Sequence, residues 1–191
     1  TAVPWSAAIN SSEYPYFYDG ATEHTSSVAV TLNAWNHVAI ARSSSTLKIF
    51  VNGVQGFSGT VTTNLDRTAG IVIAARAVLF DFVLTGYLSG LRIVKGSAVY
   101  TAAFTPPTAP STAISNTQFL LNFTNAGIYD ATSKNDLETV GNAQISTTQS
   151  KFGGSSMYFD GTGDYLYGKN TRLVDIGSGD FTIEGWLYPT T

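Results

Sequence analysis

The chain of 191 residues carries 10 Lys and Arg against 13 Asp and Glu, a formal charge of −3, and only 12% of its residues are charged. An average soluble domain has roughly 25% charged residues, so this chain is not expected to have the basic face that nucleic-acid binding requires. The absence of cysteine excludes disulfides, thiolate metal sites and cysteine nucleophiles. No apolar run approaches the roughly 20 residues that insert into a bilayer.

Alternating apolar and polar residues predict short strands from the beginning of the chain onward. The first two candidates are Tyr14–Tyr18 and Ser27–Leu32. A β-meander is predicted over Trp35–Gly56, with the apolar residues of Leu47–Val51 alternating inside it. The Asn52-Gly53 pair indicates a tight hairpin turn, because both residues tolerate positive φ angles.

The rest of the chain continues the same pattern, with Gly, Asn, Asp and Pro clusters between the apolar runs. No segment shows a sustained 3.6-residue period, so no long helix is expected. Many short strands with such turns favour a sandwich or a barrel. The further predicted strands are Ile71–Ala75, Tyr87–Val94, Gln118–Phe123, Met157–Phe159, Tyr165–Tyr167 and Phe181–Tyr188.

One segment, Thr105–Thr117, interrupts the strand pattern. Pro106, Pro107 and Pro110 cannot donate to a sheet ladder, and Ser and Thr supply much of the remainder. We therefore expect a boundary there between two halves of the sequence.

Four motifs give the chain a family resemblance. Trp35–Arg42 (WNHVAIAR) followed by Leu47–Gly53 (LKIFVNG) resembles the central strands of laminin-G-like, concanavalin A-like domains. Gly86–Ile93 and the segment that continues to Pro107 resemble the closing strand and exit of those domains. The resemblance implies an all-β fold, an antiparallel β-sandwich of the concanavalin A-like jelly-roll type. Domains of this kind are repeated in phage tail and virion proteins and in giant bacterial surface proteins.

The order of the motifs differs from that family. The motifs that open a domain there lie at Phe119–Phe123, Lys151–Ser156, Phe159–Tyr165 and Asp180–Trp186, after the closing motifs.

This order predicts three parts. Residues 1–110 would hold the central and C-terminal strands of one repeat, residues 111–117 a Pro/Ser/Thr linker, and residues 118–191 the N-terminal strands of the next repeat. The two halves could complete one sandwich within the chain, as in a permuted domain, or exchange strands between chains. Head-to-tail exchange would build a fibre.

The function predicted from this resemblance is a non-catalytic structural or adhesive repeat of a longer extracellular, cell-surface or virion fibre. Its partners would be copies of itself or neighbouring repeats, joined head to tail by β-strand complementation. The alternative is a lectin-like module that attaches its parent to cell-surface polysaccharide. A glycoside hydrolase is a remote third alternative.

Catalytic candidates are few. Glycosidases use a pair of carboxylates, and the only two on one strand face here are Asp180 and Glu184, of which Asp180 is expected to lie in the preceding turn. The histidines are His24, in a polar loop, and His37, whose role in the family's strand motif is structural. We therefore expect no enzymatic activity.

The best metal candidate is the turn that contains Asp160 and Asp164. Two carboxylates with loop carbonyls are the oxygen ligands that Ca²⁺ prefers, and many concanavalin A-like domains bind Ca²⁺. The alternative, which we favour, is a turn whose Asp side chains cap backbone N–H groups. No other cofactor is expected.

Aromatic residues supply the carbohydrate-binding candidates, because sugar rings stack on flat side chains. Alternation places Tyr14, Tyr16 and Tyr18 on one face of a strand, with Phe17 pointing inward. The alternative is packing in the core or between subunits. Further candidates are Trp5, Tyr158, Tyr165, Tyr167, Trp186 and Tyr188.

Overall fold

The structure is a computed structural model that describes residues 5–66, 70–75, 83–124, 128–169 and 175–191. The described residues form strands and no helix, and none of them lies in a helix that could cross a membrane. The strands are β1 Ser6–Ile9, β2 Pro15–Tyr18, β3 Glu23–Thr25, β4 Asn36–Ser43, β5 Thr46–Val51, β6 Val54–Thr60, β7 Ile71–Ile73, β8 Thr85–Lys95, β9 Thr117–Leu121, β10 Leu137–Val140, β11 Gln144–Ser146, β12 Ser156–Asp160, β13 Tyr165–Gly168 and β14 Phe181–Pro189.

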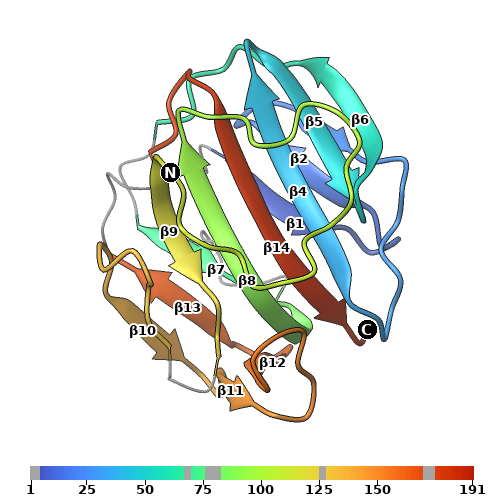
Figure 1. Cartoon of the computed structure of the whole chain (residues 1–191). Coiled ribbons are helices and arrows are strands. Elements are labelled where there is room, and N and C mark those ends of the chain that lie inside the picture. The colour runs from blue at the N-terminus through green and yellow to red at the C-terminus, as the bar shows by residue number, and fades with distance from the viewer. Residues whose placement is uncertain (1–4, 67–69, 76–82, 125–127, 170–174) are drawn as a thin grey trace.

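One large antiparallel sheet dominates the molecule, with the order β11-β12-β8-β14-β4-β5-β6 and with β9 paired to β8. The last strand of the chain, β14, lies in its middle, between β8 and β4 (Figure 1). Ile183 of β14 lies opposite Ile40 of β4 on one side and Ile93 of β8 on the other. The strands of both sequence halves therefore meet in one sheet within this chain.

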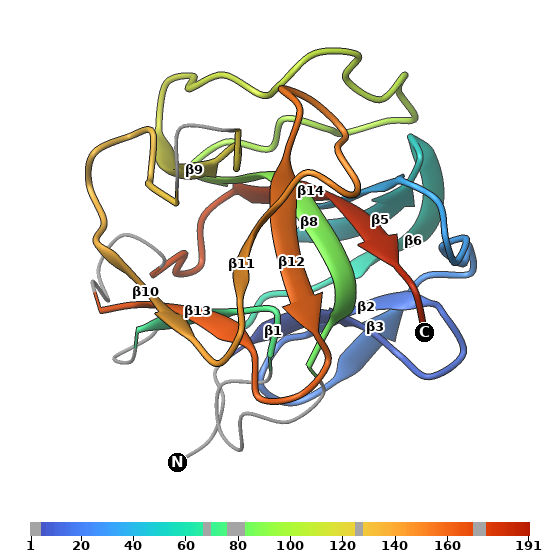
Figure 2. The ribbon, with the colours of Figure 1, turned by 90° about the horizontal axis from the view of Figure 1, so that it is seen from below.

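Two small sheets, β1-β2-β3 and β10-β13-β7, form the second layer below the large sheet (Figure 2). The side chains that alternation points toward this layer form the core, and burying each large one contributes about 1.5–3 kcal/mol. The predicted antiparallel β-sandwich is thereby confirmed. Fully buried core residues include Phe17, Leu47, Ile49, Phe119, Leu121, Phe159 and Phe181.

The predicted hairpin turn is confirmed at Asn52-Gly53, between β5 and β6. Both residues have positive φ angles, 51° and 80°. A Cβ atom on Gly53 would lie 1.8 Å from the carbonyl oxygen of Phe104. This position therefore requires glycine both for the turn and for the close approach of a distant segment.

That distant segment is residues 96–116, here called the strap, which crosses the outer face of the large sheet from β8 to β9 (Figure 1). Its amide at Phe104 donates to the carbonyl of Gly53 at 3.1 Å, and its amide at Gly96 donates to the carbonyl of Asp180 at 2.6 Å. Lys48 on β5 donates to the carbonyl of Thr101 at 2.6 Å. The strap is thus hydrogen-bonded to the sheet at its first residue and again at Thr101 and Phe104.

The strand predicted at Ser27–Leu32 is wrong, and this segment is an irregular connection. Side chains satisfy its backbone: the amide of Val28 donates to Ser26 Oγ at 3.0 Å, and the amide of Thr31 donates to Asn36 Oδ1 at 2.9 Å. Such local bonds compete with a sheet ladder. His24, predicted in a loop, lies in the short strand β3. The alternation did not reveal β1, β3, β10 and β11.

Candidate functional site

A buried ion pair, here called the sealed site, lies under the strap, where β14, β4 and β8 contribute Glu184, His37 and Arg92. Glu184 is 1% exposed, and its Oε1 accepts hydrogen bonds from Nη2 and, at 2.6 Å, from Nε of Arg92. Its Oε2 accepts from Nε2 of His37 at 3.0 Å and from the hydroxyl of Tyr100 at 2.7 Å. Arg92 also donates through Nη1 to the strap carbonyl of Thr112 at 2.9 Å.

These partners decide the protonation of the site. Burial alone raises the pKa of Glu184, but the hydrogen bond from His37, the positive charge of Arg92 and the hydrogen bond from Tyr100 outweigh it, so this pKa lies below its ordinary value of 4.5. Burial, together with the Glu184 carboxylate, raises the pKa of Tyr100. At neutral pH Glu184 is therefore an ionised carboxylate, and the Tyr100 hydroxyl that donates to it keeps its proton.

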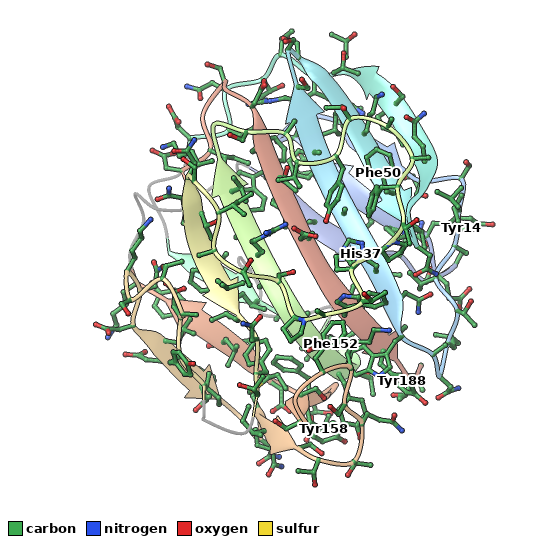
Figure 3. The ribbon with its side chains drawn as sticks, in the orientation of Figure 1. Tyr14, His37, Phe50, Phe152, Tyr158 and Tyr188 are labelled. Atoms are coloured by element: carbon green, nitrogen blue, oxygen red, sulfur yellow. The ribbon has the colours of Figure 1, made fainter. Side chains whose placement is uncertain are left out.

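Aromatic rings close this site from above. The Tyr100 and Phe104 rings stack with centroids 3.7 Å apart. The His37 ring packs edge-on against Phe104 and Trp186, with ring centroids 5.6 and 5.1 Å apart. The Phe50 ring packs in the same way against Phe104, with centroids 5.4 Å apart. Figure 3 shows His37 and Phe50 on the face of the sheet that the strap crosses. The predicted structural role of His37 therefore involves Trp186, from the other half of the sequence.

The carboxylate pair considered for glycoside hydrolysis is not arranged for that reaction. Glu184 is sealed and fully hydrogen-bonded, whereas Asp180 lies in the turn before β14 and accepts from the amide of Ser44 at 2.8 Å. Hydrolysis requires two carboxyl groups that flank a substrate in an open cleft, and a buried Glu184 offers no access.

The Asp160–Asp164 turn uses its carboxylates as backbone caps. Asp164 accepts from the amide of Asn142 at 2.5 Å and from the amide of Asp160 at 2.8 Å. Asp160 accepts from the amide of Thr162 at 2.7 Å and from the side chain of Asn142 at 3.1 Å. All four carboxylate oxygens thus have donors. Nowhere in the described ranges do three or more His, Cys, Asp or Glu side chains gather in one place.

The predicted tyrosine stripe lies at and just before β2. Tyr14, Tyr16 and Tyr18 are all half-buried, while Phe17 between them is fully buried in the core as predicted. The Tyr18 hydroxyl donates to the carbonyl of Gly20 at 2.9 Å, and Tyr16 lines an apolar cleft. The stripe is therefore only partly open, and Figure 3 shows Tyr14 at the side of the molecule.

A second group of aromatic residues crosses the outer face of the large sheet at one end, and we call it the aromatic row. It runs Tyr158, Tyr87, Tyr188, Trp35, on β12, β8, β14 and the residue before β4. Tyr87 lies directly opposite both Tyr158 and Tyr188 in the strand registers. Successive ring centroids are 5.1, 5.8 and 5.6 Å apart.

The aromatic row is partly exposed at three of its four positions, since Tyr158, Tyr188 and Trp35 are half-buried and Tyr87 is 9% exposed. Gln144 of β11 lies opposite Tyr158 and extends the row with an exposed amide. Figure 3 shows Tyr158, Tyr188 and Phe152 together at one end of the sheet, away from Phe50. The sequence analysis named Tyr158 and Tyr188 only as separate candidates. It predicted the strands that hold them but not which strands are neighbours in the sheet.

Lys151 and Phe152 border the aromatic row. The Lys151 Nζ lies 3.8 Å from the centroid of the Trp186 ring, and Phe152 contacts the same ring at 6.0 Å. Burial against these rings lowers the pKa of Lys151. Lys151 therefore makes a cation–π contact with Trp186.

Comparison with known proteins gives one family. The model of the concanavalin A-like lectin/glucanases superfamily matches residues 4–99, which include β1 to β8 and the start of the strap. No curated protein and no solved structure matches the chain.

Proposed function

Because this chain belongs to the concanavalin A-like lectin/glucanase superfamily, whose laminin-G-like domains are generally non-catalytic, we propose that it is a glycan-binding, adhesive module. Its parent would be an extracellular, cell-surface or virion protein, for which the low content of charged residues, 12%, is typical. The observation that carries the proposal is the aromatic row, four rings on four neighbouring segments of one sheet face.

The row suits an extended, neutral polysaccharide better than a compact or charged ligand. Binding sites for small molecules combine apolar and aromatic surface with a few polar groups that fix orientation. Here the rings supply surface for the C–H faces of sugars, while the tyrosine hydroxyls and the exposed amide of Gln144 supply hydrogen bonds. Since the row crosses the strands, successive sugars would contact successive strands.

The sealed state of Glu184 supports binding without catalysis. Glu184, on the same strand as Tyr188 of the row, accepts four hydrogen bonds and lies beneath the strap. A general acid or nucleophile must reach its substrate, and this one is 1% exposed. We therefore expect glycan to leave this protein unchanged.

The test is binding to a glycan array, followed by titration of the best-bound polysaccharide monitored through tryptophan fluorescence. The double variant Y158A/Y188A should weaken binding at least about tenfold, because an aromatic contact at the centre of an interface is worth more than ~1 kcal/mol. Tyr129→Ala is the matched control, since Tyr129 is 55% exposed and lies outside the row. Equal affinity of wild type and Y158A/Y188A would contradict the proposal, as would equal weakening by the control.

The same titration addresses Ca²⁺. An ion at Asp160 and Asp164 would have to replace the N–H donors that these carboxylates now have. We expect glycan affinity to be the same with Ca²⁺ and with a chelator. A loss of affinity in chelator that Asp164→Asn reproduces would instead establish a Ca²⁺ site at this turn.

A further inference from the structure

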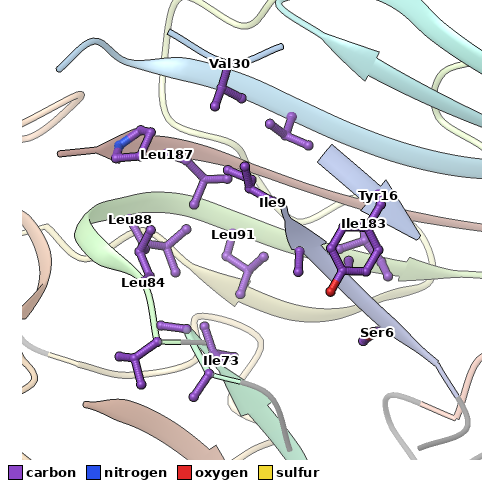
Figure 4. Close-up of a pocket in the computed structure, with 18 of the residues that line it drawn as sticks. Ser6, Ile9, Tyr16, Val30, Ile73, Leu84, Leu88, Leu91, Ile183 and Leu187 are labelled. Atoms are coloured by element: carbon purple, nitrogen blue, oxygen red, sulfur yellow. The ribbon is translucent and has the colours of Figure 1, made fainter. Parts of the chain in front are cut away.

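An apolar cleft of about 350 Å³ opens between the two small sheets of the second layer. Its floor is the inner face of the large sheet, and Figure 4 shows Leu88, Leu91 and Ile183 there. Ile9 of β1 and Ile73 of β7, each at the edge of its own small sheet, border the cleft. Binding sites for small molecules occupy roughly 300–1,000 Å³ and are mostly apolar, so the cleft has the size and the lining of such a site.

One unpaired charge lines this cleft. Glu13, half-buried in the turn between β1 and β2, has no hydrogen-bond or ion-pair partner for its carboxylate within the described ranges. Glu184, the other acidic residue of the lining, uses both of its carboxylate oxygens in the sealed site on the outer face. No Lys, Arg or His lines the cleft in the part of the chain that the structure describes. The cleft therefore offers a ligand apolar surface and a single negative group.

The backbone holds Glu13 in place. Its amide donates to the carbonyl of Asn10 at 3.0 Å, and its carbonyl accepts from the amide of Val30 at 2.9 Å. Asn10 Oδ1 also accepts from the amides of Ser12 and Tyr14, both at 3.0 Å. The φ angle of Glu13 is 63°, in the left-handed region that suits Gly or Asn better than Glu. A carboxylate thus occupies a strained and firmly held position beside the cleft, and strained positions cluster at functional sites.

The charge of Glu13 selects among possible occupants, because a molecule that fills the cleft displaces water from this carboxylate. A neutral apolar molecule would leave the carboxylate without a partner, which is unfavourable, and an anion would be repelled by it. A cationic donor would replace the lost water with a charge-assisted hydrogen bond. The lining therefore favours a ligand with an apolar body and one positive group.

We propose that the cleft binds an amphiphilic amine, whose hydrocarbon chain lies on the floor at Leu88, Leu91 and Ile183 and whose ammonium group pairs with Glu13. The main chain of an inserted strand carries no positive charge, so it would leave this carboxylate unpaired. The proposal does not use the aromatic row, and glycan binding and amine binding can fail independently.

The experiment is isothermal titration calorimetry of the full chain with decylammonium, decanol and decanoate, three probes of equal chain length, each below its critical micelle concentration. Decylammonium should bind one to one and at least about tenfold more tightly than the other two, because only its head group donates to a charged partner. Glu13→Gln should abolish this preference. Glu23→Gln is the matched control, since Glu23 lies exposed on β3 outside the cleft and its replacement changes the net charge equally.

Methyl NMR locates the bound probe. Decylammonium should shift the methyl signals of Leu91 and Ile183, which line the cleft, and leave those of Leu121, fully buried elsewhere, unchanged. Leu91→Phe fills part of the cleft and should weaken the binding of decylammonium and decanol alike.

Four outcomes would overturn the proposal. The first is that no probe binds, and the second is that all three bind with equal affinity. The third is equal weakening of decylammonium binding by E13Q and E23Q. The fourth is self-association of the unliganded chain that slows hydrogen exchange of the β1 amides as concentration rises, which would make the cleft an interface between copies.

Discussion

The outer and inner faces of β14 are covered to different extents. On the outer face, Glu184 has four donors and a covering strap, whereas on the inner face Ile183 and Leu187 border an open cleft. A buried charge without partners costs far more than an apolar surface left partly open. The difference indicates that the Glu184 site serves stability, whereas the aromatic row on the same face and the cleft on the inner face leave surface partly uncovered.

The largest expected effect comes from breaking the sealed site. Arg92→Met removes the guanidinium of β8 that pairs with Glu184 and leaves a buried carboxylate undercompensated, so the free energy of unfolding should fall by about 3–5 kcal/mol. Urea denaturation measures this. Lys169→Met is the control, because its partner Glu138 is exposed, and it should leave the unfolding midpoint unchanged. Similar midpoints for both variants would show that the strap does not seal the site.

Tyr100→Phe should have a smaller effect. It removes one hydrogen bond to an ionised group, worth about 1.5–3 kcal/mol, and keeps the stacking on Phe104. The variant should also increase hydrogen exchange of the strap amide at Val99, which donates to Thr182. Unchanged stability would mean that the strap is held by its backbone bonds alone.

A pair of overpacking variants compares the sealed core with the cleft directly. Leu91 and Leu121 lie opposite each other on β8 and β9, but Leu121 is fully buried and Leu91 borders the cleft. Leu121→Phe should cost about 1–3 kcal/mol of unfolding free energy, whereas Leu91→Phe has room to expand and should cost less. Thermal unfolding of both variants checks the order. The reverse order would contradict an open cleft.

The smallest expected effect is a pH dependence of the sealed site. A carboxylate with a lowered pKa stabilises the fold fully above its unfolded value and loses that contribution as the pH falls through the folded value. Glu184 should therefore stabilise the protein fully above about pH 4.5 and progressively less below it. The stability difference between wild type and Glu184→Gln, measured by urea denaturation, should shrink as the pH falls below this value. A difference that grows in acid would contradict the lowered pKa.

The sequence predicted which face of a strand a side chain occupies better than it predicted which strands are neighbours in the sheet. Alternation correctly predicted that Phe17 points inward, and the Asn52-Gly53 turn was correct because both residues accept positive φ angles. The partners of His37 were out of reach, because Glu184 and Trp186 lie almost 150 positions away and the register between β4 and β14 has no local signal.

The aromatic row and the cleft illustrate the same limit. Tyr87, Tyr158 and Tyr188 each alternate outward on their own strands, but only the strand order β12-β8-β14 makes them neighbours. The cleft depends on two edges, β1 and β7, that are three or four residues long and too short for a clear alternation. Repeat assembly, location and glycan class remain predictions.

The central claim is that one chain completes its own large sheet, with β14 between β8 and β4. The most direct test is isotope-filtered NMR on a mixture of ¹³C-labelled and unlabelled chains, which separates contacts within a chain from contacts between chains. We predict that the Ile183 side chain shows its contacts to Ile40 and Ile93 only within a labelled chain. The same contacts across the filter, between labelled and unlabelled chains, would mean that β14 completes a neighbour's sheet and would contradict the account.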